Sequence, residues 1–491
     1  MLSKIQAKYW ALLALCVWGG ILLYFNVLRL DTYGLDEGAA LALLVNWTVA
    51  DNIINPIVAF GMPDFRALLF APLGLYWPGS IVAAKVFTLI ITFIAALLLY
   101  NWSKQSDNDE VALIGSGLLL IAPLTIMQID QIGIGIYLLF VLGLGCKVDQ
   151  RQREAERTIG NWYFVQMLLI AVTVSLHPVG LAYPAALALR WKLDPIDKKR
   201  QQQNFIGIGI TTTIILVMQA GWVDLDWFIN PLDALSIAVA GRDISGMSQP
   251  NLFIGLVPFV LLVIVLLYDW RYLLSNTLGA TLLFTAIAGL LIADQAWAMV
   301  AISLLLYRGT HYLIKINKAI KVQGFLGQRG LVFIVMLIVA NLFMQIDTSY
   351  AKQITSNILS PEDELFQTLA LETENADKNI RIASQWPART MIAVKHAVLP
   401  LPPPAENGES FLKMIKGINY LVFAHNAPEN TNLARTIAEV SHDMKTVSIQ
   451  AGGVIVKVRD NDNDNDNDYK PDAKDIKKTQ PKNIPQENES K

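Results

Sequence analysis

The run IVAAKVFTLIITFIAALLLY, residues 81–100, decides the class of this protein. A helix over this run is about 30 Å long, which matches the hydrocarbon thickness of a bilayer. Its single charged side chain is that of Lys85. Comparable runs recur along the chain, and only 16% of the 491 residues are charged, compared with about 25% in soluble domains. We therefore expect a membrane protein.

About eleven stretches reach the length of a transmembrane helix, so the expected fold is a polytopic all-α membrane domain over residues 1–346. The predicted spans lie near residues 9–30, 81–100, 111–128, 130–146, 162–178, 179–192, 205–222, 251–268, 276–292, 295–309 and 330–346. Lys4 and Lys8 precede the first span, and no small-residue cleavage site follows it. It is therefore interpreted as a retained membrane helix and not as a signal peptide.

Charged residues are segregated between alternate connections of the predicted spans. One set is basic and includes Lys147, Arg151 and Arg153, whereas the other set is rich in aspartate. Because cytoplasmic loops carry the excess of basic residues, this pattern places the N-terminus in the cytoplasm and the C-terminal region outside. The two long outside loops, 31–80 and 222–250, contain aromatic-rich amphipathic stretches that suit helices in the membrane interface. Ordinary connecting loops are the alternative.

The last third of the chain changes character. In residues 347–459, Ser360-Pro361-Glu362 is typical of a helix start, and apolar runs such as 420–423 and 454–458 indicate strands. Helix and strand alternate, so we expect a small α/β or α+β domain on the extracytoplasmic side. Residues 460–491 begin with an Asp-Asn repeat, and we expect a disordered low-complexity tail there. Weak calcium binding by the repeat is the alternative.

Composition argues against several classes of function. The net charge is −2 and no basic face is interleaved with aromatic residues, so no nucleic acid partner is expected. Two cysteines, Cys16 and Cys146, and five histidines lack the spacing of a metal site. The sequence also has no glycine-rich loop of the kind that cradles a nucleotide phosphate.

An acidic pair, Asp36-Glu37, directly follows the first predicted span. Carboxylates beside hydrocarbon are costly to keep without a role, so this pair is the first candidate for a site. It can supply a general base or hold a cation, and on a helix the two side chains diverge by about 100°, so one alone would face a cleft. Lys85 stands near the outer end of its span, where it either snorkels to lipid phosphate or holds the phosphate of a lipid-linked substrate.

The order of these features resembles a known family. Asp36-Glu37 and an Ala-rich helix are followed by Pro63, by Tyr76-Trp77-Pro78-Gly79 and by Ala83-Ala84-Lys85. This order is similar to that of the GT-C class of membrane glycosyltransferases, especially the bacterial relatives of dolichyl-phosphate-mannose protein mannosyltransferases and the lipid A aminoarabinose transferase. The chain differs from the family at Pro63-Asp64-Phe65, which replaces a double proline, and at Asp130, which is displaced from the family's acidic position.

The resemblance implies inverting transfer of a sugar from a polyprenyl-phosphate donor to a protein, lipid or glycan acceptor. It implies that Asp36 or Glu37 is the catalytic base and that Lys85 binds the donor phosphate, at the outer face of a bacterial inner membrane. Position on the outer face adds weaker candidates, which are Asp64 as a further catalytic carboxylate, Arg66 and Arg242 as phosphate ligands, and Tyr33, Asp130 and His177 as accessory residues. Membrane lipids are expected partners. The sequence names no cofactor and no metal, although a divalent cation at the carboxylates stays open.

Two other classes of function also stay open. A transporter or flippase of lipid-linked or anionic solutes would have charges at mid-membrane, whereas this chain gathers them in loops and has no evident inverted repeat. A non-catalytic membrane scaffold would use the outside domain to bind partners, and the cell's glycans would then not depend on Asp36 or Glu37.

Overall fold

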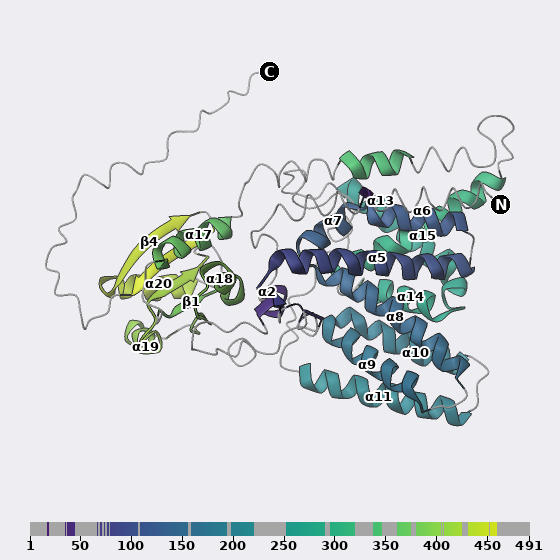
Figure 1. Ribbon diagram of the computed structural model, residues 1–491, viewed down its shortest axis with the longest axis horizontal. Helices are drawn as coiled ribbons and strands as arrows, with labels where there is room; N and C mark the ends of the chain where they lie inside the picture. The colour runs from purple at the N-terminus through teal and green to yellow at the C-terminus, as the bar shows by residue number, and fades with distance from the viewer. Residues whose placement is uncertain are drawn as a thin grey trace, which may run out of the picture.

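A computed structural model describes most of the chain. The described residues are 17–18, 35, 37–44, 66, 69–70, 73, 76–77, 79–106, 109–155, 159–193, 198–219, 252–289, 295–319, 337–345, 361–374, 380–403, 405, 407–424, 431–450 and 452–458. They form a bundle of helices and a smaller domain built on a five-stranded sheet (Figure 1). The predicted tail 460–491, the loop 222–250 and most of the loop 31–80 lie outside these residues.

Helix α5 (Ile81–Ser106) contains the apolar run that dominates the sequence. Within the described ranges, it is the one helix that is long and apolar enough to cross a bilayer without a break. The next two helices, α6 (Asp109–Leu120) and α7 (Pro123–Asp130), form a second candidate span that bends by 50°. Proline has no N–H and its ring displaces the preceding turn, so the bend falls at Pro123. The predicted span near 111–128 thus corresponds to this bent pair, and the sequence analysis did not foresee the bend.

The other helices of the bundle are shorter or more polar. They are α8 (Ile134–Glu154), α9 (Asn161–Leu176), α10 (Ala182–Leu193), α11 (Lys198–Gln219), α13 (Leu252–Leu273), α14 (Thr277–Gly289) and α15 (Gln295–Ala319). A helix as short as α10 extends about 18 Å, which is less than a bilayer. It follows α9 through the short 3-10 turn η1 (Pro178–Leu181), where the sequence predicts a break. The predicted count of about eleven spans is not confirmed by the part of the chain that the structure describes.

Apolar side chains cover much of the outside of this bundle. On α11, Ile206, Ile210, Ile214 and Val217 are between 52% and 70% exposed. Residues at this spacing share one face of a helix. Soluble proteins rarely leave a continuous apolar surface of this kind in water. The bundle thus has the surface of a membrane protein, as its composition predicts.

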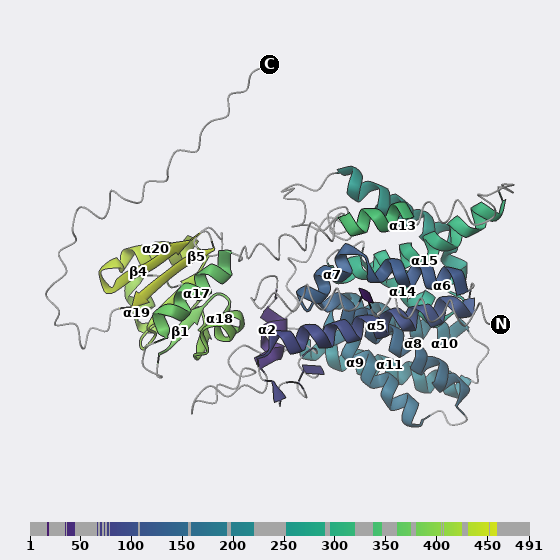
Figure 2. The same ribbon diagram turned by 45° about the horizontal axis from the view of Figure 1, so that its top comes forward.

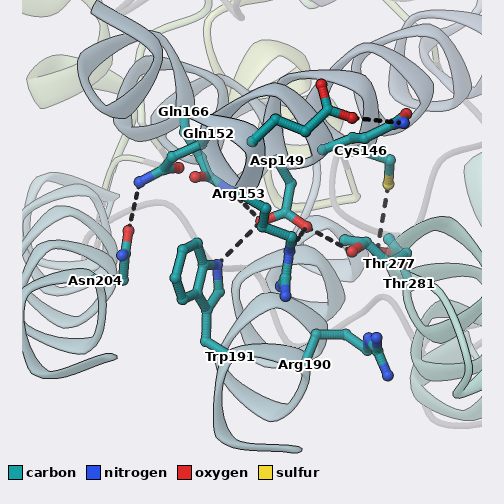
Figure 3. A network of polar contacts seen from close by, with 12 residues as sticks. Cys146, Asp149, Gln152, Arg153, Gln166, Arg190, Trp191, Asn204, Thr277 and Thr281 are labelled. Atoms are coloured by element: carbon teal, nitrogen blue, oxygen red, sulfur yellow. Dashed lines mark hydrogen bonds and ion pairs between the residues drawn. The ribbon is translucent and has the colours of Figure 1, made fainter. Parts of the chain in front are cut away.

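The buried carboxylate of Asp149, on α8, joins four helices (Figure 3). Its Oδ2 accepts hydrogen bonds from Arg153 Nε of the same helix at 2.8 Å and from Thr277 Oγ1 of α14 at 2.5 Å. Its Oδ1 accepts from Trp191 Nε1 of α10 at 3.0 Å and from Gln166 Nε2 of α9 at 3.2 Å. A buried charge is tolerated only when it is paired and hydrogen-bonded. Asp149 therefore fixes how α8, α9, α10 and α14 pack against one another.

We expect Asp149→Ala to destabilise the protein by about 3–5 kcal/mol, because it removes the buried carboxylate that pairs with Arg153 and accepts hydrogen bonds from three other helices. The measurement is thermal unfolding of the detergent-solubilised chain. Asp109→Ala is the control, since Asp109 is 65% exposed in its ion pair with Lys104 and such pairs contribute about 0–1 kcal/mol. Equal effects of the two substitutions would contradict the role given to Asp149.

The smaller domain alternates helices and strands. Its elements are α17 (Pro361–Thr373), β1 (Ile382–Ser384), α18 (Pro387–Val394), β2 (Val398–Pro400), α19 (Gly408–Met414), β3 (Tyr420–Phe423), α20 (Thr431–Glu439), β4 (Met444–Gln450) and β5 (Gly453–Val458). The strand order is β2-β1-β3-β5-β4. The first three strands are parallel, whereas β5 runs antiparallel to both β3 and β4.

Alternate residues of these strands belong to two separate cores. Val422 and Ile455 cluster with side chains of α17 and α18, and this core is continuous with that of the helical bundle. Leu421 and Val456 cluster with side chains of α19 and α20. The sheet is therefore covered on both faces, which explains why β3 reads Tyr-Leu-Val-Phe without polar alternation.

Candidate functional site

Lys85 lies near the beginning of α5, at the end of the bundle next to α2 (Glu37–Leu44), which we call the α2 end. Its Nζ is 2.7 Å from Oδ1 of Asp130, the last residue of α7. Both side chains are buried, with 3% and 0% of their surface exposed. Lys85 therefore does not snorkel to the lipid surface, which was one of its two predicted roles. It is held inside the protein by a carboxylate 45 residues away.

Arg66 is a second buried cation, and it binds the turn that follows Asp130. The guanidinium is buried, and its Nη1 donates to the carbonyl oxygen of Ile132 at 2.8 Å. Ile132 has φ of +56°, a left-handed backbone conformation that is rare for a β-branched residue. Such strain costs on the order of 1–3 kcal/mol and persists where the surroundings enforce it, often at functional sites.

The side chain of Gln128 enforces the turn at Ile132. Its Oε1 accepts the N–H of Gly135 at 2.9 Å, and its main-chain carbonyl accepts the N–H of Gly133 at 2.7 Å. The turn between α7 and α8 is therefore fixed at several points. Asp130, the last residue of α7, stands directly before this turn and beside Lys85.

A polar and aromatic layer lies one helical turn further along α5. Thr88 Oγ1 donates to the carbonyl of Ala84 at 2.8 Å, so the hydroxyl of Tyr137 is the donor in its 2.6 Å contact with Thr88. The ring of Tyr137 packs edge-on against that of Phe70, with centroids 5.9 Å apart. This layer joins α5 to α8 one helical turn beyond Lys85 along α5.

Glu37 connects the bundle to the smaller domain. Its Oε2 accepts the main-chain N–H of Ala388 at 2.8 Å, and its Oε1 accepts that of Arg389 at 3.3 Å. These N–H groups belong to the first turn of α18, where Trp386 provides no side-chain cap and proline occupies the start of the helix. A carboxylate at this place satisfies unpaired N–H groups and the positive end of the helix dipole. Glu37 therefore caps a helix that lies about 350 residues away in sequence.

The position of α2 is set from both sides. Gly79, with φ of 68°, donates its N–H to the carbonyl of Leu43 at 3.2 Å, which ties α2 to the start of α5. On the other side α2 contacts α18. Figure 2 shows α2 between the sheet domain and the near end of α5, as does Figure 1. The α2 end of the bundle, with Lys85, is thus the end covered by the smaller domain.

His177 has a local structural contact. Its Nδ1 accepts the N–H of Val179 at 3.1 Å and caps the 3-10 turn between α9 and α10. Four other predicted site residues, Tyr33, Asp36, Asp64 and Arg242, lie outside the described residues. The structure therefore brings together Lys85, Asp130 and Arg66, and it directs Glu37 toward the smaller domain.

Sequence reasoning missed Gln128, Ile132, Thr88 and Tyr137. One signal was available, because Thr88 follows Lys85 by three residues and shares its helix face within an otherwise apolar run. No feature of the sequence predicts the left-handed backbone conformation of Ile132. Among the described residues, no group of three or more His, Cys, Asp and Glu side chains could hold a metal ion.

Comparison with solved structures identifies proteins of similar fold. No family model and no curated protein matches the sequence. Among solved structures, ArnT from Cupriavidus metallidurans bound to undecaprenyl phosphate superposes with a TM-score of 0.56 and 12% identity, over 92% of this chain and 98% of that one. The chain has a GT-C-like fold. The apo form of the same ArnT gives a TM-score of 0.54 at 11% identity, with the same coverage of both chains.

A further similarity is to an oligosaccharyltransferase of Archaeoglobus fulgidus in complex with zinc and sulfate, with a TM-score of 0.48 and 12% identity over 80% of this chain and 64% of that one. The superposition on ArnT confirms, at the level of the fold, the resemblance first seen in the order of Asp36-Glu37, Pro63 and Lys85.

We expect Glu37→Ala to weaken the contact between α2 and α18 by about 1 kcal/mol, the usual contribution of a capping carboxylate. Amide hydrogen exchange of the full chain measures it directly at Ala388 and Arg389. Glu409→Ala is a suitable control, because Glu409 is an exposed acid in the first turn of α19. Unchanged protection of the α18 amides in Glu37→Ala would show that the cap is dispensable.

Proposed function

We propose that this chain is a glycosyltransferase that moves a sugar from a polyprenyl-phosphate donor to an acceptor at the α2 end of the bundle. The observation that carries the proposal is the buried pair of Lys85 and Asp130 at 2.7 Å, placed at the end of the membrane bundle that the smaller domain covers. The GT-C-like fold supports it, since the ArnT of similar fold was crystallised with undecaprenyl phosphate.

In this proposal Lys85 and Arg66 bind the donor phosphate. Asp130 Oδ1 accepts a hydrogen bond from Lys85 Nζ at 2.7 Å and so orients the ammonium group. The phosphate gains negative charge as its bond to the sugar breaks, and fixed cations in a site with little water stabilise that charge strongly. Arg242 stays a third candidate for the same role.

An apolar cavity offers room for the lipid part of such a donor. It has a volume of about 560 Å³ and lies along α5 and α6, lined by Phe93, Leu97, Leu113 and Leu120 among others. Phe93 is eight residues beyond Lys85 on α5, a rise of about 12 Å. A prenyl chain in this cavity would therefore leave its phosphate end toward Lys85.

We assign the general base to Asp36, with Asp64 as the second candidate. Glu37 is a weaker choice, because both of its carboxylate oxygens accept hydrogen bonds from α18. The base takes the proton of the acceptor hydroxyl or amine, whose freed electron pair forms the new bond to the sugar. The sugar–phosphate bond breaks on the opposite face and the lipid phosphate departs with that electron pair, so the configuration inverts.

The basic residues at one end of the bundle indicate its orientation in the membrane. Lys147, Arg151, Arg190 and Lys192 lie at the end of the bundle away from α2, toward the last turns of α8 and α10. With the positive-inside bias, this far end is cytoplasmic, and the α2 end and the smaller domain are extracytoplasmic. A bacterial inner membrane is the expected location.

We expect Asp36→Asn to lower the rate of sugar transfer by about 10²–10⁴-fold, the usual contribution of a general base. Glu37→Gln keeps most of the rate. The measurement is mass spectrometry of lipid A, envelope proteins and surface polysaccharide from cells that carry each variant in place of the wild-type chain. Full restoration of every missing sugar by Asp36→Asn would remove Asp36 as the base.

A second experiment separates the function of the buried pair from its part in stability. Lys85→Ala removes the ammonium group that pairs with the buried carboxylate of Asp130, and it is expected to destabilise the protein by about 3–5 kcal/mol. The double variant Lys85→Met/Asp130→Leu is expected to regain stability, because apolar residues of similar volume replace the pair, and yet to lose transfer.

The matched control is Arg308→Met/Asp269→Leu, which replaces a second buried ion pair, between α15 and α13. We expect it to keep transfer activity. Activity of Lys85→Met/Asp130→Leu equal to that of this control would mean that the Lys85–Asp130 pair only supports the fold.

A further inference from the structure

A second cavity lies at the far end of the bundle, opposite the proposed active site. Its volume is about 270 Å³, and it is lined by the last turns of α5 and α8, by α10 and by the turn between α13 and α14. Its charged lining residues are three cations, Lys147, Arg153 and Arg190, and one carboxylate, Asp149. We propose that this cavity binds the phosphate-bearing headgroup of an anionic lipid.

The single carboxylate of the cavity does not repel such a headgroup. Asp149 is buried and accepts hydrogen bonds from Arg153, Trp191, Thr277 and Gln166, so its charge is balanced within the protein (Figure 3). The guanidinium of Arg153 is held in addition over the ring of Trp191, at 4.6 Å from its centroid. Cations therefore outnumber carboxylates among the lining residues, and Arg153 is held in place by two contacts.

The other two cations reach the cavity from different helices. Arg190 of α10 donates its Nη1 to the carbonyl of Leu274 at 2.7 Å, which anchors the guanidinium at the wall. Lys147 of α8 is exposed at the rim. Two anchored guanidinium groups and a flexible ammonium match the several acceptor oxygens of a phosphate ester.

One neutral side chain in the lining, that of Asn276, also favours an anion. The Oδ1 of Asn276 accepts hydrogen bonds from Trp102 Nε1 at 2.8 Å and from the N–H of Gly279 at 2.7 Å. The polar group that Asn276 retains is therefore its amide donor. At the exposed rim, the hydroxyl of Ser275 donates to the carbonyl of Tyr272 at 2.6 Å.

The location identifies the anion as part of a lipid. Asn101, in the cavity wall, follows Lys85 by 16 residues on α5, a separation of about 24 Å, so the cavity opens toward the opposite membrane surface. Its lining combines the cations with apolar groups such as Leu98 and Leu278. Basic pockets between membrane helices recognise anionic lipid headgroups in this way.

The test uses the full chain in a neutral detergent and native mass spectrometry, with phosphatidylglycerol and phosphatidylcholine as probes. The wild-type chain is expected to bind phosphatidylglycerol more tightly. Each cation near a membrane surface contributes about fivefold in affinity, so Lys147→Gln/Arg190→Gln should weaken phosphatidylglycerol binding by about 25-fold and leave phosphatidylcholine unchanged. The matched control is Arg151→Gln/Lys192→Gln, two exposed cations on the same helices that do not line the cavity.

A second pair of variants keeps the test independent of folding defects. Ser275→Glu places a negative charge at the exposed rim and is expected to reduce phosphatidylglycerol binding, whereas Ser275→Gln, of nearly the same shape, is not. Equal binding of phosphatidylglycerol by the wild-type chain, Ser275→Glu and Lys147→Gln/Arg190→Gln would overturn the proposal. So would competition by inorganic phosphate without discrimination between the two lipids, because the site would then bind a soluble anion.

This outcome is separate from that of the proposed glycosyl transfer. Asp36→Asn is expected to retain the preference for phosphatidylglycerol, since Asp36 directly precedes α2 in the sequence and α2 lies at the other end of the bundle from the cavity.

Discussion

The carboxylate of Asp149 has no solvent around it, and four helices are arranged so that their donors replace that solvent. Arg153, Gln166, Trp191 and Thr277 each direct one hydrogen atom to its two oxygens. In hydrocarbon there is little hydrophobic force between helices, so packing and polar contacts of this kind decide which helices are neighbours. The same requirement acts on Lys85 at the α2 end of the bundle, where Asp130 supplies the counter-charge.

These two buried charges differ in what surrounds them. Around Asp149 the donors come from four helices, so the carboxylate is held from several sides. This arrangement suits a structural role. Around Lys85, Asp130 supplies a carboxylate close to the strained turn at Ile132, and a second cation, Arg66, donates to the carbonyl of Ile132. Two buried cations held near one turn suit a site that stabilises an anion.

The smaller domain takes part in this end of the bundle through a small number of specific contacts. Its sheet has helices on both faces, and one of these, α18, lacks a cap of its own. Glu37, the first residue of α2, provides the cap, and the proposed base Asp36 directly precedes it in the sequence. The residue that docks the domain is therefore the immediate sequence neighbour of the proposed base.

The sequence alone determined the class of the protein and many of its elements. Composition and the run at 81–100 indicate a membrane bundle, His177-Pro178 marks the break between α9 and α10, and the apolar runs of 420–423 and 454–458 predict β3 and part of β5. These features depend on local propensity and on transfer to lipid, both of which are written into adjacent residues. Only the tertiary structure decided that Lys85 pairs with Asp130 and that Glu37 caps α18. Those contacts join residues 45 and about 350 positions apart, and whether a charge beside a membrane is solvated, snorkels or is paired depends on which helices the fold places around it.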